Sequence, residues 1–421
     1  MVLVLKDNLL DTAWKQDHVQ EIVLNILNQV KNEGDKAVLE LTKRYDGVDL
    51  EEIQVPKTEL KKAYSQVSPE TVKALEFAAE QIRFFAEKQM SCLQPVECSH
   101  IAGVTLGSRL VPIQTCGAYV PAGRYPLPST ALMSVIPAKV AGVERVAACS
   151  PPSKGYDRIH PAVLVGLDIA GVDDVYCMGG AQAIAAYAFG TASVPKVDVI
   201  VGPGNRFVTE AKRQVNGMVG IDMLAGPSEV LIIADETASP VSVAVDLLAK
   251  CEHDSASIAI LLTTSRELAE QVEEEIENEL KTLGTAALAR KTWEENGKIV
   301  LVDSLDEAVA ESDQFAPEHL QLMTAHHDEL ALKLRNFGSL FIGHSAPVAF
   351  GDYVSGTNHT LPTMQTARFS NGVWVGTFLK MSSYQVVTAE GAAVLAGPCA
   401  HLAGVEGLLA HQRSAQLRMK K

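Results

Sequence analysis

Residues 229–280, EVLIIADETASPVSVAVDLLAKCEHDSASIAILLTTSRELAEQVEEEIENEL, decide the fold class. The apolar run EVLIIA is followed by a polar turn and by apolar residues at helical spacing, and the run IAILLT then repeats this order. Ser239 and Pro240 are typical of a helix start, because Ser caps free N–H groups and Pro fits the first turn. Strands that alternate with helices form parallel sheets, so this stretch predicts an α/β fold.

Other segments extend this pattern in the N-terminal direction. Residues 141–149, AGVERVAAC, and residues 170–178, AGVDDVYCM, share AGVxxV and start about 30 residues apart, which is the length of one βαβ unit. Further upstream, apolar residues at helical spacing predict two helices over residues 18–46, broken at Gly34. A charged amphipathic helix is predicted over about residues 68–90.

The composition favours a small-molecule partner. The 421 residues are 47% hydrophobic, enough for two or more domains, and the formal net charge is −15. Because the chain has no basic run, we expect no nucleic acid or acidic membrane partner. The seven cysteines form no CxxC pair, and no apolar run approaches the roughly 20 residues of a membrane span. Charge at Lys6 and Asp7 argues against a secretory signal, so we expect a cytoplasmic protein.

Three predicted turns between a strand and a helix are rich in glycine or proline. The positive end of a helix, together with residues that let the backbone approach closely, can hold the phosphates of a dinucleotide. Parallel sheets bind ligands where their strands end, so three such turns in one block favour a nucleotide site. The turns are YVPAGRYPLPST (residues 119–130), MGGAQAIAAYAFG (178–190) and VGPGNRFVTEAK (201–212).

Several polar residues lie together at the end of the helix predicted after Pro240. Lys250 and His253 would share a helix face, while Cys251 is expected to pack as a small buried residue. One interpretation is a surface helix end whose His interacts with the helix dipole. The other is a site of His and carboxylate groups, which suit zinc binding and proton transfer. Three further pairs keep this second interpretation open: Glu318 with His319, Asp352 with His359, and Glu406 with His411.

Together these motifs resemble the histidinol dehydrogenase family over nearly the whole chain. The matching stretches, in the order of the family, are YVPAGRYPLPSTALMSVIPAKVAGV, GGAQAIAAYAFGT, VGPGNRFVTEAKRQVNGMVGIDMLAGPSEVLIIAD, CEHD, APEHL, FGDYVSGTNHTLPT and EGLLAH. The resemblance implies an enzyme that uses zinc and NAD to oxidise a primary alcohol through an aldehyde to a carboxylic acid. L-histidinol to L-histidine is the default reaction.

The resemblance also implies roles for residues at matching positions. His319 would take the hydroxyl proton, and Glu318 would activate the water that adds to the aldehyde. The zinc ligands would be His253, Asp352 and, in a homodimer with a shared active site, His411 of the partner subunit. The residues expected to contact NAD are Tyr119, Gln182 and Asn205. Besides these catalytic and metal-binding residues, the substrate would contact Ser228, His359 and Glu406.

The architecture implied by the resemblance has two incomplete Rossmann-like domains, a helical N-terminal part and a C-terminal tail that is swapped in a dimer. Residues 1–118 and 230–371 would form the first domain, and residues 119–229 would form an inserted second one. The tail would comprise residues 372–421, which are rich in Ala, Gly and Leu and show no clear strand pattern. We therefore expect a helical tail.

Two positions depart from the family. Ala122 stands in VPAG where VPGG is usual, and Lys250 stands where the family has a glutamine zinc ligand. An ammonium group has three donors and no lone pair, so it binds zinc only after losing a proton. Either a neutral Lys250 is a ligand, or zinc keeps three protein ligands while Lys250 binds an anionic substrate group; we favour the second. Two alternative functions are a paralogue that acts on another small alcohol, such as sulfopropanediol, and a catalytically silent paralogue that binds nucleotide or metal.

Overall fold

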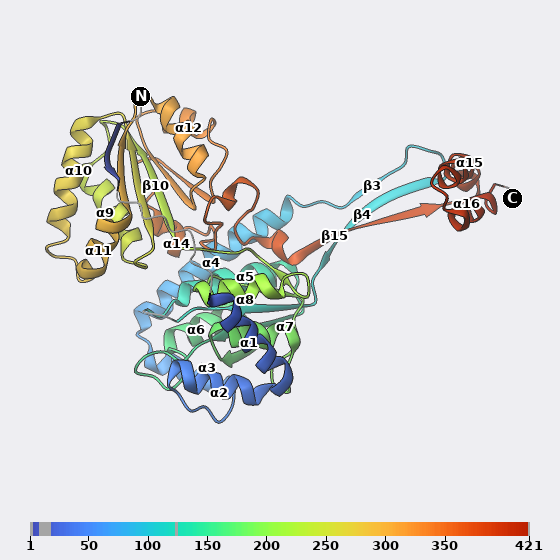
Figure 1. The fold of residues 1–421 in the computed structure, drawn as a ribbon, viewed down its shortest axis with the longest axis horizontal. Helices are drawn as coiled ribbons and strands as arrows, with labels where there is room; N and C mark the ends of the chain where they lie inside the picture. The colour runs from blue at the N-terminus through green and yellow to red at the C-terminus, as the bar shows by residue number, and fades with distance from the viewer. Residues whose placement is uncertain (1–2, 8–17, 123–124, 420–421) are drawn as a thin grey trace.

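The structure is a computed structural model, and Figure 1 shows two α/β bodies with a long arm that carries the C-terminal helices. This arrangement confirms the α/β fold class. The described residues are 3–7, 18–122 and 125–419. Residues 1–2, 8–17, 123–124 and 420–421 lie outside this description. Our predictions for these residues, which include two positions of the loop 119–130, therefore have no structural counterpart here.

The first body contains a six-stranded sheet in the order β1-β12-β11-β10-β13-β14. Strands β10 to β14 are parallel to their neighbours, whereas β1 pairs antiparallel with β12. This parallel sheet is the arrangement that residues 229–280 predicted. Its strands are β1 (Leu3–Asp7), β10 (Glu229–Ala234), β11 (Ile258–Thr263), β12 (Gly297–Leu301), β13 (His319–Met323) and β14 (Ser339–Ile342).

Helices cover both faces of this sheet, because successive side chains of a strand point to opposite faces. Val230 and Ile232 pack with α9, α10 and α11, whereas Leu231 and Ile233 pack with α12. Ser239 accepts a hydrogen bond from the Ser242 N–H and caps α9, as predicted. The helices of this body are α9 (Pro240–Cys251), α10 (Arg266–Glu279), α11 (Ala286–Asn296), α12 (Leu305–Phe315), α13 (His327–Ala331) and α14 (Val348–Tyr353).

The second body contains another six-stranded sheet, in the order β2-β7-β6-β5-β8-β9. The short β2 pairs antiparallel with β7, and the other neighbours are parallel. The two AGVxxV segments each contain a helix end at a glycine with positive φ, Gly142 or Gly171, followed by a strand. The strands are β2 (Gln54–Val55), β5 (Thr115–Tyr119), β6 (Arg145–Ser150), β7 (Asp174–Cys177), β8 (Val199–Val201) and β9 (Gly220–Ile221).

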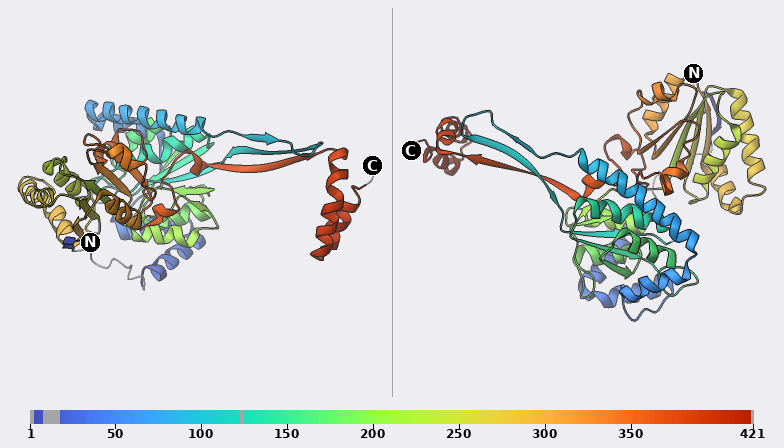
Figure 2. Two further views of the ribbon diagram at one scale, coloured as in Figure 1. Left: turned by 90° about the horizontal axis from the view of Figure 1, so that it is seen from above. Right: turned by 180° about the vertical axis from the view of Figure 1, so that it is seen from behind.

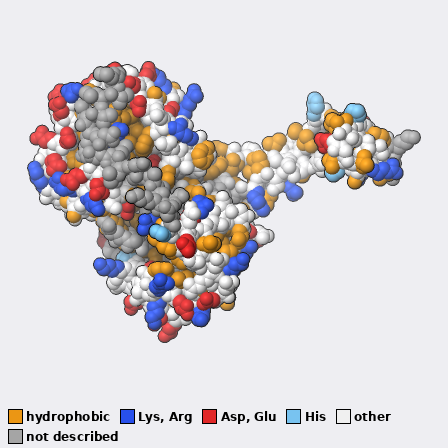
Figure 3. Space-filling view, in the orientation of Figure 1, with side chains coloured by type: hydrophobic (Ala, Val, Ile, Leu, Met, Phe, Trp, Pro, Cys, Tyr) orange, Lys and Arg blue, Asp and Glu red, His pale blue; other side chains and the backbone are white. Residues whose placement is uncertain are grey.

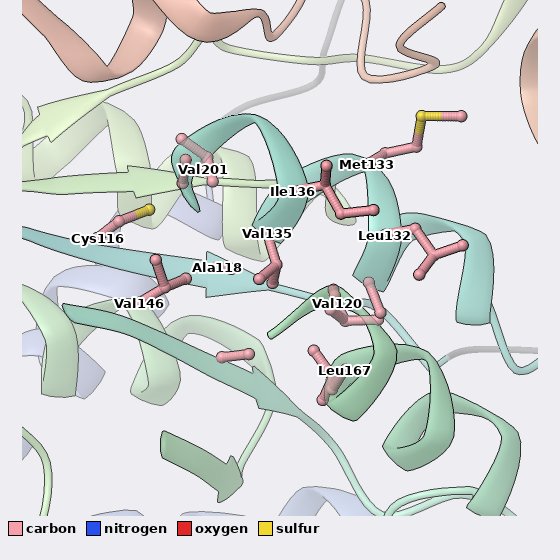
Figure 4. Close-up of a cluster of buried hydrophobic side chains, with 14 of the residues drawn as sticks. Cys116, Ala118, Val120, Leu132, Met133, Val135, Ile136, Val146, Leu167 and Val201 are labelled. Atoms are coloured by element: carbon pink, nitrogen blue, oxygen red, sulfur yellow. The ribbon is translucent and has the colours of Figure 1, made fainter. Parts of the chain in front are cut away.

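The core of the second body also has two layers. On one face, Cys116 and Ala118 of β5 pack with Val135 and Ile136 of α5, as Figure 4 shows. The other face is covered by α1, α2, α7 and α8. The helices of this body are α1 (Val19–Glu33), α2 (Asp35–Asp46), α3 (Lys57–Ala63), α4 (Pro69–Ser91), α5 (Pro128–Ala141), α6 (Pro161–Ala170), α7 (Gly180–Phe189) and α8 (Arg206–Val215).

The N-terminal helices form where they were predicted, with the break between α1 and α2 at Gly34. Their packing partners differ from the domain division that we drew from the sequence, which placed residues 1–118 with residues 230–371. Helices α1 and α2 contact α7, and α4 contacts α5 and α6. The division into domains stays a prediction, and these contacts favour one that places α1 to α4 with residues 119–229.

The arm is a three-stranded antiparallel sheet in the order β15-β4-β3, with two helices at its far end. It projects from the second body in every view of Figures 1 and 2. The tail is helical as predicted, but our expectation that it lacks a strand is wrong, because β15 pairs along the full length of β4. The elements of the arm are β3 (Val96–Cys98), β4 (Val104–Pro112), β15 (Leu379–Val387), α15 (Ala389–Val405) and α16 (Leu409–Gln416).

Hydrophobic side chains gather along the arm and on its terminal helices, as the space-filling view shows (Figure 3). Leu106, Met381 and Val386 on the strands and Leu402 and Leu409 on the helices are all exposed. A monomeric protein rarely exposes so extended an apolar surface, so the arm has the character of a contact surface. In the described ranges, the structure has no helix with both the length and the apolar character needed to span a bilayer.

Candidate active site

The predicted catalytic residues and the predicted substrate contact Ser228 lie at the amino ends of two neighbouring strands of the first sheet. Ser228 directly precedes β10, and Glu318 directly precedes β13, whose first residue is His319. Because β10 and β13 pair in parallel register, with Val230 opposite His319, the two strand starts lie side by side. Parallel sheets more often use their carboxyl ends for binding, so this position could not be derived from strand order alone.

Glu318 is a buried carboxylate held by two donors. Its Oε2 accepts hydrogen bonds from the Ser228 hydroxyl at 2.7 Å and from the Glu229 N–H at 2.8 Å. Among the described residues, the structure gives Oε1 no hydrogen-bond partner. The carboxylate is therefore fixed by one oxygen, while the other can accept a proton from a bound molecule.

His319 is held beside this carboxylate. Its Nδ1 lies 2.9 Å from the backbone oxygen of Glu229 and 3.3 Å from Glu318 Oε2. A carbonyl oxygen can only accept, so Nδ1 carries a proton, and Nε2 is the basic atom of the neutral ring. Nε2 lies 3.2 Å from Oδ1 of Asp352, the penultimate residue of α14.

Lys250 completes this group from the last turn of α9. Its side chain is only 3% exposed, and its Nζ lies 3.8 Å from Oδ2 of Asp352. Our interpretation of Lys250 as part of a surface helix end is therefore wrong, because the chain buries the ammonium group between α9 and α14. Cys251, the next residue, is buried as predicted.

His253 lies in the turn after α9 and is exposed. Although part of the residue is open to solvent, protein atoms crowd its ring, and this crowding and the Lys250 charge lower the pKa of His253 to about 4, so the ring is neutral at pH 7. The nearby Asp352 and Glu318 carboxylates act in the opposite direction. His253 therefore belongs to the same electrostatic group as Lys250, Glu318, His319 and Asp352.

The charges of this group set its protonation states. Burial and the Lys250 charge lower the pKa of His319, but the Glu318 and Asp352 carboxylates outweigh them and raise it to about 9. Burial raises the pKa values of Glu318 and Asp352, but the charges of His319 and Lys250 outweigh this effect and lower both. At neutral pH, His319 is thus an imidazolium between two carboxylates.

Glu229 supports the catalytic pair and was missed in the sequence. Its side-chain oxygens accept hydrogen bonds from the N–H groups of Glu318, at 3.3 Å, and Met364, at 2.8 Å. Burial is the largest of the effects that raise its pKa to about 7. Its position next to Ser228 was visible in the sequence, but nothing there showed that its side chain crosses to the neighbouring strand.

His359 links this group to the second body. Its Nδ1 lies 2.8 Å from the backbone oxygen of Asp352, and its Nε2 lies 3.1 Å from the hydroxyl of Thr130 in the first turn of α5. Asn358 likewise donates to the Met133 carbonyl oxygen in α5. The helix that follows the first predicted nucleotide loop therefore contacts the loop that carries His359.

The residues predicted to contact NAD lie at adjacent loops of the second sheet. The hydroxyl of the buried Tyr119 accepts a hydrogen bond from the Gly180 N–H, at the start of α7, at 3.2 Å. Gln182 lies in the first turn of α7 and is buried. Asn205 caps α8 by accepting from the N–H groups of Phe207 and Val208. NAD binding by these residues stays a prediction.

A buried ion pair shapes the third of these loops. Lys212 and Asp222 pair with each other, and both also bind the backbone of Gly202. Lys212 donates to the Gly202 carbonyl oxygen at 3.0 Å, and Asp222 accepts from the Gly202 N–H at 2.7 Å. Gly202 has a φ of 118°, and a Cβ there would collide with the backbone oxygen of Tyr119. Sequence reasoning missed this pair, because its members belong to different elements and no motif marked them.

Glu406 and His411 are not brought to this group within the chain. Both are exposed; Glu406 directly follows α15 and His411 lies on α16, and Figure 1 shows these helices far from β10 and α14. Their predicted roles therefore require a second copy of the chain, and they stay predictions.

Comparisons with known proteins identify the family of the chain. Residues 11–419 match the family model described as Histidinol dehydrogenase. The chain belongs to the histidinol dehydrogenase family. A histidinol dehydrogenase homolog of Shouchella clausii is 44% identical over 100% of this chain and 99% of its own length. The histidinol dehydrogenase of Methanothermobacter thermautotrophicus is 45% identical over 96% and 94% of the two chains.

The structural comparison gives the same result. The crystal structure of histidinol dehydrogenase from Elizabethkingia anophelis has a TM-score of 0.91 to this chain at 38% identity, covering 95% of this chain and 92% of that one. This chain is thus an oxidoreductase of the histidinol dehydrogenase type, which confirms the enzyme class that the sequence predicted.

The zinc site expected for a member of the histidinol dehydrogenase family fits the residues of this chain poorly. Among the described residues, no group of three or more His, Cys, Asp or Glu side chains is arranged to hold a metal. Asp352, an expected ligand, already has His319 on one oxygen and the Lys250 ammonium on the other. A divalent ion at this carboxylate would be repelled by that ammonium.

Proposed function

We propose that this protein uses NAD to oxidise a primary alcohol through an aldehyde to a carboxylic acid, with L-histidinol as the default substrate. The observation that carries the proposal is the buried pair of Glu318 and His319, which offers a base and a carboxylate at one point. Family membership supports the reaction class. We also propose that the protein acts in the cytoplasm, which agrees with its cysteine usage.

His319 acts as the base of each oxidation. The Glu229 carbonyl oxygen holds the proton on Nδ1, so in the neutral ring, whose share rises as the pH approaches about 9, Nε2 is the atom that takes the proton of a bound hydroxyl group. As that O–H bond breaks, the carbon–oxygen double bond forms and the carbon transfers a hydride to NAD⁺. The products of this step are an aldehyde, NADH and a protonated His319.

Glu318 acts between the two oxidations. Its lowered pKa keeps it ionised at neutral pH, and Oε1 faces no protein donor in the described chain. This carboxylate can take a proton from the water that adds to the aldehyde, while the protonated His319 returns its proton to the aldehyde oxygen and becomes a base again. The resulting diol loses a hydroxyl proton to His319 and a hydride to a second NAD⁺, which gives the acid.

The experiment that tests the proposal is an assay of NADH formation with purified protein, NAD⁺ and either L-histidinol or sulfopropanediol. We expect two NADH for each acid formed from histidinol, with the acid identified by mass spectrometry. His319→Asn should lower the rate by about 100-fold to 10,000-fold, the usual contribution of a general base. The absence of NADH formation with every alcohol would contradict the proposal. Activity on sulfopropanediol alone would show that sulfopropanediol, and not L-histidinol, is the substrate.

A further inference from the structure

A positive charge is built into the centre of the candidate active site. The Lys250 side chain is almost completely buried, and its Nζ lies 3.8 Å from the Asp352 carboxylate. Asp352 in turn lies 3.2 Å from Nε2 of His319, so the ammonium is one residue away from the predicted base. A buried lysine normally needs a compensating carboxylate, and Asp352 provides one.

The same position is unsuited to a divalent metal. An ammonium group has three N–H donors and no lone pair for a metal, and its charge lowers the affinity of the neighbouring carboxylate for a second cation. Asp352 Oδ1 lies 3.2 Å from Nε2 of His319, so both oxygens of this carboxylate already have a neighbouring side chain, the His319 ring on one side and the Lys250 ammonium on the other.

We propose that the Lys250 ammonium takes the place of a metal ion, so that this enzyme binds its alcohol without zinc. The inference rests on the proposed function for the identity of the bound alcohol. Within residues 3–7, 18–122 and 125–419, Lys250 Nζ has an ion pair with Asp352 and no hydrogen bond, so its N–H groups can donate to the alcohol oxygen. When His319 removes the hydroxyl proton and hydride leaves for NAD⁺, the ammonium stabilises the negative charge that develops on that oxygen. Lys250 keeps its own protons throughout.

The direct test is the zinc content of the purified full-length protein after equilibration with zinc chloride and gel filtration. We expect the wild type to retain far less than one zinc per chain, measured by inductively coupled plasma mass spectrometry. Lys250→Gln replaces the ammonium with an amide oxygen that can bind a metal. We expect this variant to bind zinc at least about tenfold more tightly than the wild type in calorimetric titrations, since a unit charge near the site is removed.

Two controls separate charge from fold. Lys333→Gln removes an exposed lysine paired with Asp306 on the same body, and it should leave zinc binding unchanged. Lys250→Arg keeps the charge and should bind zinc as poorly as the wild type, whereas Lys250→Met removes the charge without adding a ligand and should show an intermediate affinity. Circular dichroism checks that each variant is folded.

The outcomes distinguish this inference from the proposed function. A wild-type protein that holds one zinc per chain, and loses activity when a chelator removes it, would overturn the inference whatever the variants do. A gain of zinc in Lys250→Gln, with no such binding in the wild type, supports it even if neither alcohol is oxidised. NADH formation that persists in the presence of a chelator supports both.

Discussion

The hydroxyl oxygen of Thr130 lies 3.1 Å from Nε2 of His359. Nδ1 of His359 faces the Asp352 carbonyl oxygen, which can only accept, so Nδ1 is protonated and Nε2 accepts from the Thr130 hydroxyl. Burial lowers the pKa of His359, which keeps the ring neutral. This hydrogen bond connects the helix after a predicted NAD loop to the loop beside Asp352, and it thereby couples the two bodies at the site.

Thr130→Val should weaken this coupling. The substitution keeps the shape of the side chain but leaves a buried ring nitrogen without a donor, which costs about 1–3 kcal/mol of stability. We expect a lower unfolding free energy in urea and a higher KM for the alcohol, because His359 is a predicted substrate contact. Thr130→Ser retains the hydroxyl and should behave like the wild type; equal effects of the two substitutions would argue against the hydrogen bond.

The activity should rise with pH up to about 9. Below its pKa of about 9, His319 is protonated and cannot accept a proton, so kcat/KM should increase as the pH rises from 7 to 9 and then level off. Profiles of kcat/KM measured in overlapping buffers test this expectation. A plateau that begins near pH 6.5 would show that the neighbouring carboxylates do not hold the proton on His319.

The same shift predicts a pH dependence of stability. A folded-state pKa above the unfolded value of 6.5 means that the charged ring stabilises the native state fully below pH 6.5. This contribution should decrease as the pH rises towards 9. Unfolding free energies of the wild type and His319→Asn at pH 6, 7.5 and 9 should therefore converge with increasing pH, and a constant difference would contradict the shift.

Lys212→Met should be strongly destabilising and should weaken NAD binding. It leaves the Asp222 carboxylate buried without its partner, which costs about 3–5 kcal/mol. It also removes a donor to the Gly202 carbonyl oxygen in the loop before Asn205. We expect a lower melting temperature and a higher KM for NAD⁺. Combining it with Asp222→Leu should recover much of the stability but not the NAD affinity, since the leucine cannot bind the Gly202 N–H.

Mixed dimers should test whether His411 acts in the active site of the partner subunit. His319→Asn and His411→Asn should each have low activity as pure proteins. When the two are refolded together in equal amounts, half of the dimers should be mixed, and each mixed dimer has one intact site. About a quarter of the wild-type activity should therefore return, as expected for a symmetric dimer with a shared site. Separately folded proteins mixed without unfolding provide the control, and no recovery after refolding would exclude a shared site.

The sequence predicted the parts of the fold that depend on local patterns. Ser239 and Pro240 start a helix, Gly34 ends one, and the AGVxxV segments form equivalent turns, because caps and periodicity involve neighbouring residues. The strand β15 was missed because almost all of its side chains are exposed. Its sequence therefore lacks the alternation of buried and exposed residues that marks a strand on a core.

The site was predictable to a similar extent. The resemblance placed Glu318, His319, Asp352 and Lys250 in one group, and the structure brings these four together. The roles of Glu229 and Thr130 could not be predicted, since each acts through side-chain contacts with elements distant in the chain. The burial of Lys250 was likewise invisible, because it depends on α14 closing over the end of α9.

The exposed arm affects how efficiently this chain can fold and assemble. Leu106, Met381 and Val386 are 46%, 63% and 57% exposed on paired strands that lie away from either core. A newly folded chain therefore exposes the apolar surface of the arm until a partner molecule buries it. Exposed apolar strands of this kind favour non-native strand pairing and aggregation. The yield of active enzyme on refolding should pass through a maximum with concentration, limited by slow encounter in dilute solution and by aggregation in concentrated solution.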